Sequence, residues 1–252
     1  MTTTALSANT FHDNLRALAA AQKPAHNTAA YSRLVNRPLG RVVAAYGHLV
    51  GLTPNQATAI SAALSGAALL VLPLHAPTWW LGLVVSLLLA SGYVMDSVDG
   101  QLARLRGGGS RAGEWADHTV DCFKTATLHL VVLISWYRFS DVRGWWLLVP
   151  LGFEVVAIVT YFGLILMPTL RRPAAPDAGV RQAENPLRKY ALLPMDYGAI
   201  CWLFVLLGWA EGFRWAYLAV FVCNAAALAL ALRKWWRELR VLDVASLAAS
   251  AP

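Results

Sequence analysis

Charged residues are scarce in this sequence, and their scarcity excludes an ordinary soluble domain. Asp, Glu, Lys and Arg make up 14% of the 252 residues, whereas hydrophobic residues make up 58%. Soluble globular domains carry about 25% charged residues. The hydrophobic residues gather in continuous runs of about 20 residues, the length of a helix that crosses a bilayer. Because the runs lack the alternation of an outer-membrane barrel, we predict an all-α integral membrane protein.

Cysteine is rare as well, with three residues, and a secretory signal is lacking. The cysteines are Cys122, Cys201 and Cys223, and their spacing suits neither a metal site nor a disulfide framework. We expect each to be a buried small hydrophobic side chain. Residues 1–30 do not have the basic and then apolar layout of a signal peptide, so we interpret them as a soluble N-terminal arm.

Six hydrophobic segments predict six transmembrane helices in one domain. They cover residues 56–74, 79–96, 117–137, 145–168, 191–209 and 214–232. Residues 31–52, which precede them, mix arginines with apolar residues in the pattern of an amphipathic helix that lies in the membrane interface. We therefore divide the chain into the arm (1–30), the six-span domain (31–240) and a C-terminal tail (241–252).

The basic residues predict the orientation in the membrane. Seventeen of the twenty-one Lys and Arg residues fall on one side of the predicted spans, three fall on the other, and Lys124 lies inside a span. Such a bias places both termini in the cytoplasm of a protein integral to the cell membrane. The net charge of +7 is then a signal of topology and of contact with membrane lipids. Since no soluble basic domain is present, we expect no nucleic-acid partner.

Four aspartates stand at the cytoplasmic ends of the second and third spans. Asp96 and Asp99 are three residues apart, and Asp117 and Asp121 are four apart, so each pair shares one helix face. Four converging carboxylates repel one another unless a cation lies between them. Oxygen ligands favour Mg²⁺, Mn²⁺ or Ca²⁺. Two ions can share four carboxylates, as in many phosphoryl-transfer sites, and we predict two ions, Mg²⁺ or Mn²⁺.

The residues between the two pairs suit a nucleotide. Gly100 and Ala103 leave a surface with little side chain, which a flat nucleotide can approach. Arg104 adds a cation suited to phosphate oxygens. The run Gly107–Gly109 allows the chain to reverse, and Gly113 allows the next helix to begin close to its neighbour.

These residues together resemble the signature of the CDP-alcohol phosphotransferases. The matching pattern is Asp96-x2-Asp99-Gly100-x2-Ala103-Arg104-x8-Gly113-x3-Asp117-x3-Asp121. The resemblance covers about residues 31–240. It implies a transferase that moves a phospho-alcohol or phosphatidyl group from a CDP-linked donor to an alcohol or lipid acceptor and releases CMP, in phospholipid biosynthesis.

The resemblance also implies roles for individual residues. The metal ligands would be Asp96, Asp99, Asp117 and Asp121, and the CDP-binding residues would be Asn55, Gly100, Ala103, Arg104 and Gly113. In much of the family the last aspartate, here Asp121, is the base that takes the proton of the acceptor. The segment GEWADHTVD (Gly113–Asp121) resembles a variant found in choline and ethanolamine phosphotransferases, in which a histidine has this role. His118 and Asp121 are therefore both candidate catalytic bases.

A second resemblance leaves the transferred alcohol open. The segment YSRLVNRPLGR (Tyr31–Arg41), followed by TPNQ, is similar to the entry segment of the members that transfer to inositol phosphate. A soluble phosphorylated acceptor is therefore an alternative.

Four cations are candidates for binding that acceptor. Lys124 shares a helix face with Asp117, so it either balances the carboxylates, binds a substrate phosphate or reaches toward the membrane interface. Arg171, Arg172 and Arg188 lie in the loop between the fourth and fifth spans, on the side of the aspartates.

Two further questions concern function class and assembly. A divalent-cation transporter is the rival from another class, but transporters often show internal repeats and broken helices at the midplane. Here the acids stand at span ends and the sequence has no internal repeat. A homodimer is a candidate assembly.

Overall fold

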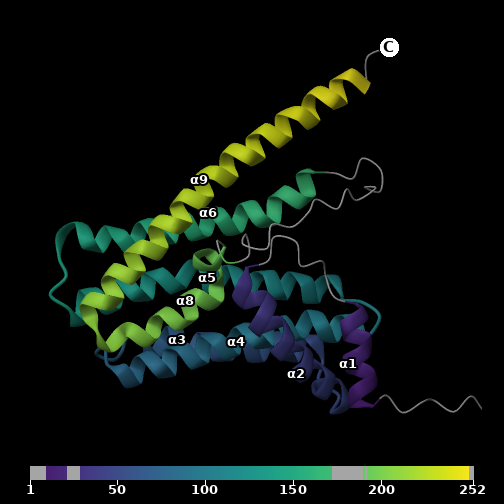
Figure 1. Cartoon of the computed structure of the whole chain (residues 1–252), viewed down its shortest axis with the longest axis horizontal. Coiled ribbons are helices and arrows are strands. Elements are labelled where there is room, and N and C mark those ends of the chain that lie inside the picture. The colour runs from purple at the N-terminus through teal and green to yellow at the C-terminus, as the bar shows by residue number, and fades with distance from the viewer. Residues whose placement is uncertain (1–9, 22–28, 172–189, 191, 250–252) are drawn as a thin grey trace, which may run out of the picture.

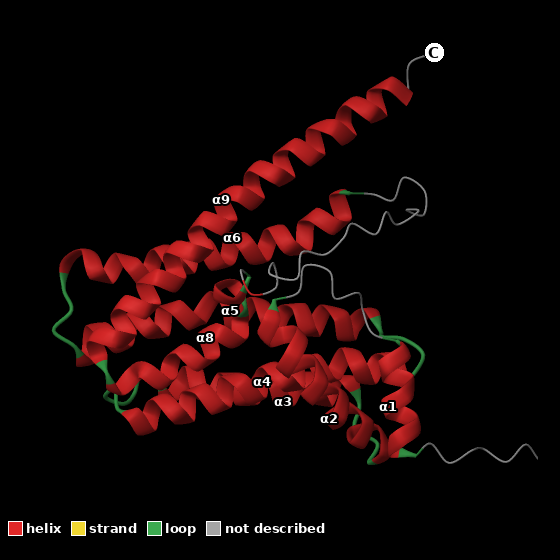
Figure 2. Ribbon diagram, viewed as in Figure 1, coloured by secondary structure: helices red, strands yellow, loops and turns green. Residues whose placement is uncertain are grey.

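The computed structural model describes residues 10–21, 29–171, 190 and 192–249, and every regular element in these ranges is a helix (Figures 1 and 2). The elements are α1 (Phe11–Ala20), η1 (Ser32–Asn36), α2 (Arg37–Leu49), α3 (Pro54–Val71), α4 (Trp79–Leu105), α5 (Arg111–Phe139), η2 (Gly144–Leu147), α6 (Leu148–Leu170), η3 (Leu193–Met195), α8 (Tyr197–Leu203), η4 (Phe204–Gly208) and α9 (Ala210–Ala249). The all-α prediction is confirmed for the described part of the chain.

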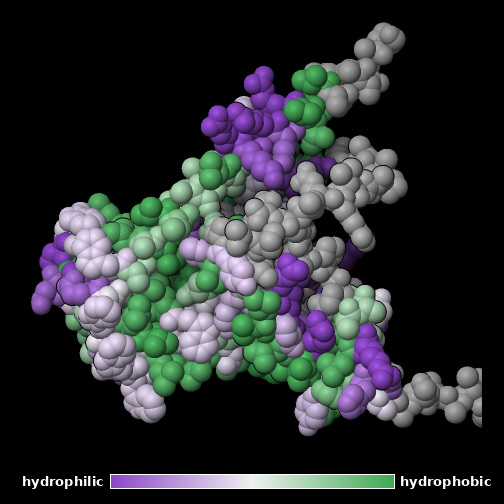
Figure 3. Space-filling view, viewed as in Figure 1, coloured by the Kyte–Doolittle hydropathy of each residue, from purple (hydrophilic) through white to green (hydrophobic). Residues whose placement is uncertain are grey.

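Three of the described helices are long and apolar enough to cross a membrane. They are Trp79–Leu105, Gly144–Leu170 and Ala210–Val244. The predicted fifth span corresponds to a shorter apolar stretch, Tyr197–Gly208, in which α8 tightens into the 3₁₀-helix η4. Hydrophobic residues cover much of the middle of the molecule in Figure 3, with hydrophilic residues gathered toward its ends. The six-span count remains a prediction.

Helix α4 lies at the centre of the bundle. It packs closely against α3, where the Ser61 hydroxyl donates a hydrogen bond to the carbonyl of Gly92 at 2.9 Å. Further along, Val85 and Leu89 of α4 join a buried apolar cluster with Phe204 and Tyr217. Small and polar residues thus bring α3 and α4 together, while large apolar residues fill the space toward α8 and α9.

Part of the predicted soluble arm packs on the helical domain. Helix α1 begins with a capping box between Thr10 and Asp13. Its Leu18 is fully buried in a cluster with apolar residues of α2 and α4, Val98 and Leu102 among them. The side-chain amide of Asn14 donates to the Ala45 carbonyl at 3.2 Å. The C-terminal end of α4 is therefore held between α1, α2 and α3.

The predicted amphipathic segment forms η1 and α2, and its small residues face inward. Gly40 and Ala44 are buried, whereas Leu39, Val42 and Val43 are exposed. A Cβ at Gly40 would lie 2.8 Å from the hydroxyl oxygen of Ser97 on α4, which shows how closely the two helices approach. The larger apolar side chains of α2 are thus left on the outer surface.

Two of the cysteines are not buried. Cys201 lies in the apolar cluster, as expected, but Cys122 and Cys223 are exposed on α5 and α9. The expectation of burial was wrong for these two, because an apolar run that faces lipid gives the same sequence pattern as one that faces a protein core.

The packing of α1 leads to a stability prediction. Leu18→Ala removes a fully buried side chain and leaves a cavity, which destabilises by about 2–5 kcal/mol. We expect α1 to detach first, because it has few other buried residues. Hydrogen exchange of the α1 amides should rise in this variant and not in His12→Ala, which changes an exposed position. Unchanged exchange in Leu18→Ala would contradict the observed packing.

Candidate functional site

The reversal between α4 and α5 brings their acidic ends together. Gly107 and Gly108 have φ angles of +83° and +142°, which side chains other than glycine rarely allow. Ser110 then caps α5, and its hydroxyl accepts from the amide of Gly113 at 3.0 Å. The glycine run therefore has the predicted role of a tight connection between the two helices.

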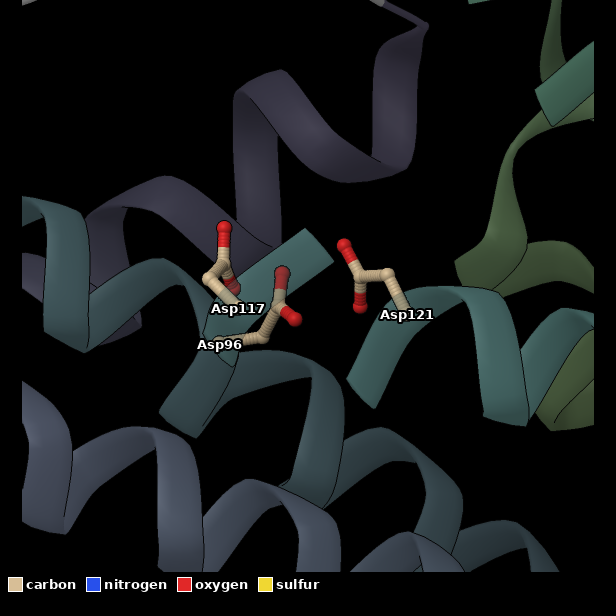
Figure 4. Close-up of side chains that lie close together, drawn as sticks. All are labelled: Asp96, Asp117 and Asp121. Carbon is tan, nitrogen blue, oxygen red and sulfur yellow. The ribbon is translucent and has the colours of Figure 1, made fainter. Parts of the chain in front are cut away.

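Three aspartates face one another across this helix pair. Asp96 comes from α4, and Asp117 and Asp121 come from α5, and one carboxylate oxygen of each lies within 4.8 Å of the others. Figure 4 shows their carboxylates turned toward a shared space between the helices. We call Asp96, Asp117 and Asp121 the aspartate group.

Asp99 lies beside the aspartate group and has other partners. Its side chain is buried, and one oxygen accepts a hydrogen bond from the Thr58 hydroxyl at 2.7 Å. The other oxygen accepts from the backbone amide of Gly100. Asp99 therefore links the start of α3 to α4, and it is outside the three-residue group that the described part of the chain forms.

Lys124 is buried between two members of the aspartate group. Its Nζ lies 2.8 Å from Asp96 Oδ1 and 2.6 Å from Asp121 Oδ1. Of the interpretations open from the sequence, the structure favours charge balance, since the side chain is 8% exposed and its ammonium contacts two carboxylates.

A large cleft of about 580 Å³ opens next to the aspartates. Its lining includes all five residues that the family resemblance assigns to CDP, namely Asn55, Gly100, Ala103, Arg104 and Gly113. Asp99, Asp117 and His118 also line it. Residues from α3, α4 and α5 therefore meet in one cleft whose acidic side adjoins the aspartate group.

The shape of the large cleft depends on its glycines. A Cβ at Gly113 would lie 2.9 Å from Asn55 Oδ1, so α3 and α5 could not approach as closely with a larger residue. A Cβ at Gly100 would meet only the end of the Arg104 side chain, at 3.7 Å, so this surface is open. The guanidinium of Arg106 donates to the carbonyls of Gly51 and Leu52 and thereby fixes the loop before α3.

A small cavity of about 280 Å³ lies on the side of α4 that faces α2. Arg37 and Arg104 line it together with Asp96, Asp99 and Asp117. The Nε atom of Arg104 is buried and has no hydrogen-bond partner among the described residues. The two guanidinium groups place positive charge beside the carboxylates, and a phosphate group bound there would need such charge.

His118 stands at the mouth of the large cleft with its side chain 47% exposed. Its Nδ1 lies 4.0 Å from Asp117 Oδ2. The hydroxyl of Tyr161 on α6 donates to the His118 carbonyl at 2.5 Å, which ties this turn of α5 to α6. The spacing in the sequence suggests Asp121 as the carboxylate that orients the imidazole, but the structure sets Asp117 beside it.

Of the three loop arginines expected to bind an acceptor, the structure describes Arg171. Arg171 forms an ion pair with Glu238 of α9, with 2.6 Å between Nη2 and Oε2. Arg172 and Arg188 lie outside the described residues. Among the described cations, Arg37 and Arg104 are the ones that line the small cavity.

Two residues of the site, Thr58 and Arg37, were not predicted from the sequence. Thr58 holds Asp99, but a threonine inside an apolar helix also bonds its own backbone, as Thr58 does with the Pro54 carbonyl at 3.2 Å. Arg37 belongs to a segment whose arginines all suit lipid headgroups. Only the packing of α2 against α4 distinguishes it from Arg33 and Arg41.

The aspartate group has the chemistry of a divalent-cation site. Its ligands are carboxylate oxygens, which hard ions such as Mg²⁺ and Mn²⁺ prefer. Three such groups close together repel one another unless positive charge lies among them. In the structure Lys124 supplies part of that charge, and the free oxygens of Asp96, Asp117 and Asp121 could hold an ion.

Comparison with known proteins gives a family and a fold. The family profile described as CDP-alcohol phosphatidyltransferase matches residues 51–231. No curated protein sequence matches the chain. The fold resembles Mycobacterium tuberculosis phosphatidylinositol phosphate synthase with CDP-DAG bound, with a TM-score of 0.54 and 21% identity over 80% of this chain and 94% of that chain. The same synthase in complex with manganese and citrate gives 0.54 and 20%, over 80% and 89%.

The aspartate group leads to a prediction about metal binding. Mn²⁺ should raise the thermal unfolding temperature of the purified protein, because an ion that binds only the folded state stabilises it. Asp117→Asn should remove most of this increase, and EDTA should reverse it in the unchanged protein. Asp141→Asn, at an exposed position between α5 and η2, should respond as the unchanged protein does. An equal response in Asp117→Asn would show that Mn²⁺ binds elsewhere.

Proposed function

The chain belongs to the CDP-alcohol phosphatidyltransferase family, and we propose that it transfers a phosphatidyl or phospho-alcohol group from a CDP-activated donor to an alcohol while CMP leaves. It is a CDP-alcohol phosphotransferase of phospholipid synthesis and a membrane protein. The family match and the absence of an internal repeat in the sequence favour the transferase over a cation transporter.

The large cleft is the observation that supports this proposal most directly. Asn55, Gly100 and Gly113 come from three helices and line one open surface, next to Arg104 and the carboxylates. A cytidine could lie on the glycine-rich surface, and its pyrophosphate would then extend toward Arg104 and Asp117. The unpartnered Nε of Arg104 would donate to a phosphate oxygen.

Of the two kinds of donor, a CDP-linked lipid has more support than a soluble CDP-alcohol. The similar solved structure of phosphatidylinositol phosphate synthase has CDP-DAG bound. In this chain the large cleft lies at one end of helices whose outer surfaces are apolar, so acyl chains could remain in the membrane while the headgroup enters the cleft. A soluble CDP-alcohol with a lipid acceptor is the competing pair, and the assay below separates the two.

A divalent cation, Mg²⁺ or Mn²⁺, would be held by Asp96, Asp117 and Asp121, with Asp99 adjoining them. When bound it would neutralise the pyrophosphate and stabilise the leaving CMP. Other residues of the chain position the carboxylates and contact the phosphates. Thr58 holds Asp99 in place, and the Gly100 amide fixes its second oxygen. Arg104, which lines the cleft beside Asp99, is available for the phosphates.

A phosphorylated, inositol-type acceptor is the second candidate for this site. The small cavity supports it, because Arg37 and Arg104 place two guanidinium groups beside the aspartates. The two solved structures described above are of a phosphatidylinositol phosphate synthase. The small cavity is therefore a better candidate for the phosphate of an acceptor than Arg171, which is paired with Glu238.

His118 is the better candidate for the base. Asp117 lies on the Nδ1 side of its imidazole, which leaves Nε2 to take the proton of the acceptor hydroxyl. The acceptor oxygen would then bond to the phosphorus that carries the alcohol, and the bridging oxygen would leave with CMP. Asp121 is less suited to this role, because its carboxylate is engaged by Lys124.

The placement in the membrane follows from the helices and the charges. We propose six spans, formed by α3, α4, α5, α6, the α8–η4 stretch and α9, with the site and both termini facing the cytoplasm. The exposed Leu39, Val42 and Val43 of α2 support a helix lying in the interface, with these side chains toward the lipid. A homodimer would be compatible with this placement.

The proposed reaction can be tested by the release of CMP. Purified protein with Mg²⁺ or Mn²⁺ should release CMP from CDP-diacylglycerol when a suitable alcohol is present, with inositol phosphate and glycerol phosphate as the first acceptors. Soluble CDP-alcohols with diacylglycerol form the competing set. Asp117→Ala should lower the rate by at least about 100-fold, since the bound metal contributes several kcal/mol. Asp141→Ala is the matched control. No CMP from any pair would refute the proposal.

The identity of the base can be tested by comparing two variants. His118→Ala should lower kcat by about 10²–10⁴-fold while Mn²⁺ still binds, because a general base contributes this much. Asp121→Asn should weaken Mn²⁺ binding as well as turnover. If His118→Ala retained full activity and Asp121→Asn lost it without any change in Mn²⁺ binding, Asp121 would be the base.

A further inference from the structure

Helix α9 is longer than a membrane span, and basic residues follow its apolar part. Its 40 residues extend about 60 Å at about 1.5 Å per residue, whereas the hydrocarbon core of a bilayer is about 30 Å thick. Arg233, Arg237 and Arg240 come directly after the predicted sixth span, 214–232. Residues three and four apart share one face of a helix, and we call these three residues the arginine stripe. Figure 3 shows hydrophilic residues gathered on this part of α9.

The contacts of α9 with α6 turn the arginine stripe outward. Trp235 packs over Gly163 of α6, and Glu238 forms an ion pair with Arg171 at 2.6 Å. In a helix with 3.6 residues per turn, the arginine stripe lies on the face opposite Trp235 and Glu238. All three arginines are exposed. Their direction is therefore fixed by the packing of the two helices.

None of the three arginines takes part in an ion pair among the described residues. The described ion pairs of α9 are Arg214–Glu211, Arg171–Glu238 and Lys234–Glu238. Like charges three or four residues apart on a helix repel one another. An anion bound between the guanidinium groups would relieve this repulsion, so the arginine stripe has the charge pattern of an anion-binding surface.

The depth of the arginine stripe matches the headgroup layer of a bilayer. With Ala210 at one edge of the hydrocarbon core, Arg233 lies about 35 Å along α9 and Arg240 about 45 Å. The other edge of the core is at about 30 Å, and the headgroups extend about 5–8 Å beyond it. Arg240 is then within a Debye length, about 10 Å, of the headgroups. Trp236, which is 67% exposed, stands at the level where tryptophans gather in membrane proteins.

We propose that the arginine stripe binds the headgroups of anionic phospholipids at the end of the bundle that carries the site. Helix α6 connects the two places. Its Tyr161 donates to the His118 carbonyl at the mouth of the large cleft, and Arg171, directly after this helix, pairs with Glu238 of α9. Each basic residue near a membrane surface adds to the attraction of anionic lipids. A nucleic acid fits this depth less well, because the anionic membrane surface repels it.

The inference does not depend on the proposed reaction. The arginine stripe would gather any anionic lipid, whether that lipid is a substrate, a product or neither. A CDP-linked lipid is itself anionic, so a donor of this kind would be concentrated close to the large cleft.

The binding of lipid can be measured without turnover. The purified protein is reconstituted in phosphatidylcholine vesicles that contain a trace of spin-labelled phosphatidylglycerol or spin-labelled phosphatidylcholine. Electron paramagnetic resonance separates the lipid held at the protein from the free lipid, because the held lipid moves more slowly. We expect phosphatidylglycerol to be held several-fold more strongly than phosphatidylcholine. The preference should shrink at about 1 M salt, where the Debye length falls to about 3 Å.

Variants of exposed residues assign the preference to the arginine stripe. Arg233→Gln, Arg237→Gln and Arg240→Gln together should lower it at least about threefold. Arg237→Gln alone should lower it less, in the same direction. Lys234→Gln is the matched control, because it removes the same charge from the same helix at a position that is paired with Glu238 and lies off the stripe. This control should keep the preference of the unchanged protein.

Several results would overturn the inference. Equal retention of the two lipids by the unchanged protein would show that no anionic lipid is selected. A preference that survives the triple substitution, or that falls equally in Arg237→Gln and Lys234→Gln, would assign it to other basic residues or to net charge. If the triple variant loses its helical circular dichroism, the comparison of the two single variants decides. An oligonucleotide that binds the unchanged protein but not the triple variant, without any lipid preference, would assign the stripe to nucleic acid.

Discussion

The architecture of the site depends on the mutual repulsion of carboxylates where α4 and α5 meet. One carboxylate oxygen of each of Asp96, Asp117 and Asp121 lies within 4.8 Å of the others, so their negative charges repel one another. The buried ammonium of Lys124 offsets part of this repulsion through two short ion pairs. The remaining negative charge suits the cation site that we propose, and a cation held there would attract an anionic substrate.

Different faces of helix α4 carry the acidic side chains of the site and the apolar side chains that hold the helix in place. One face carries Asp96, Asp99, Gly100 and Ala103, of which the last three line the large cleft. The face that bears Val98 and Leu102 is buried against α1 and α2. Because α4 is packed by neighbours on several sides, its acidic end can be rigid although it stands at the end of a membrane-spanning helix. Rigid support of this kind favours precise placement of reacting groups.

Several features of the site were predictable because they depend on local chain geometry. Residues three or four apart share a helix face, so the two aspartate pairs could be recognised before any packing was known. Glycines at positive φ mark a chain reversal, which is how the run Gly107–Gly109 could be interpreted. The family signature then identified the residues that line the large cleft. The cysteines were less predictable, because apolar helices facing lipid or protein look alike in sequence.

The sequence by itself determined the helical class and the reversal at the glycine run, and it predicted the set of residues to which we assign the proposed chemistry. The tertiary structure decided which of them meet. It set Asp117 beside His118, paired Lys124 with Asp96 and Asp121, and engaged Asp99 with Thr58. It also brought Arg37 to the small cavity and α1 onto α4. These contacts join residues far apart in the chain, and they depend on helix packing and side-chain direction, which spacing along one helix does not specify.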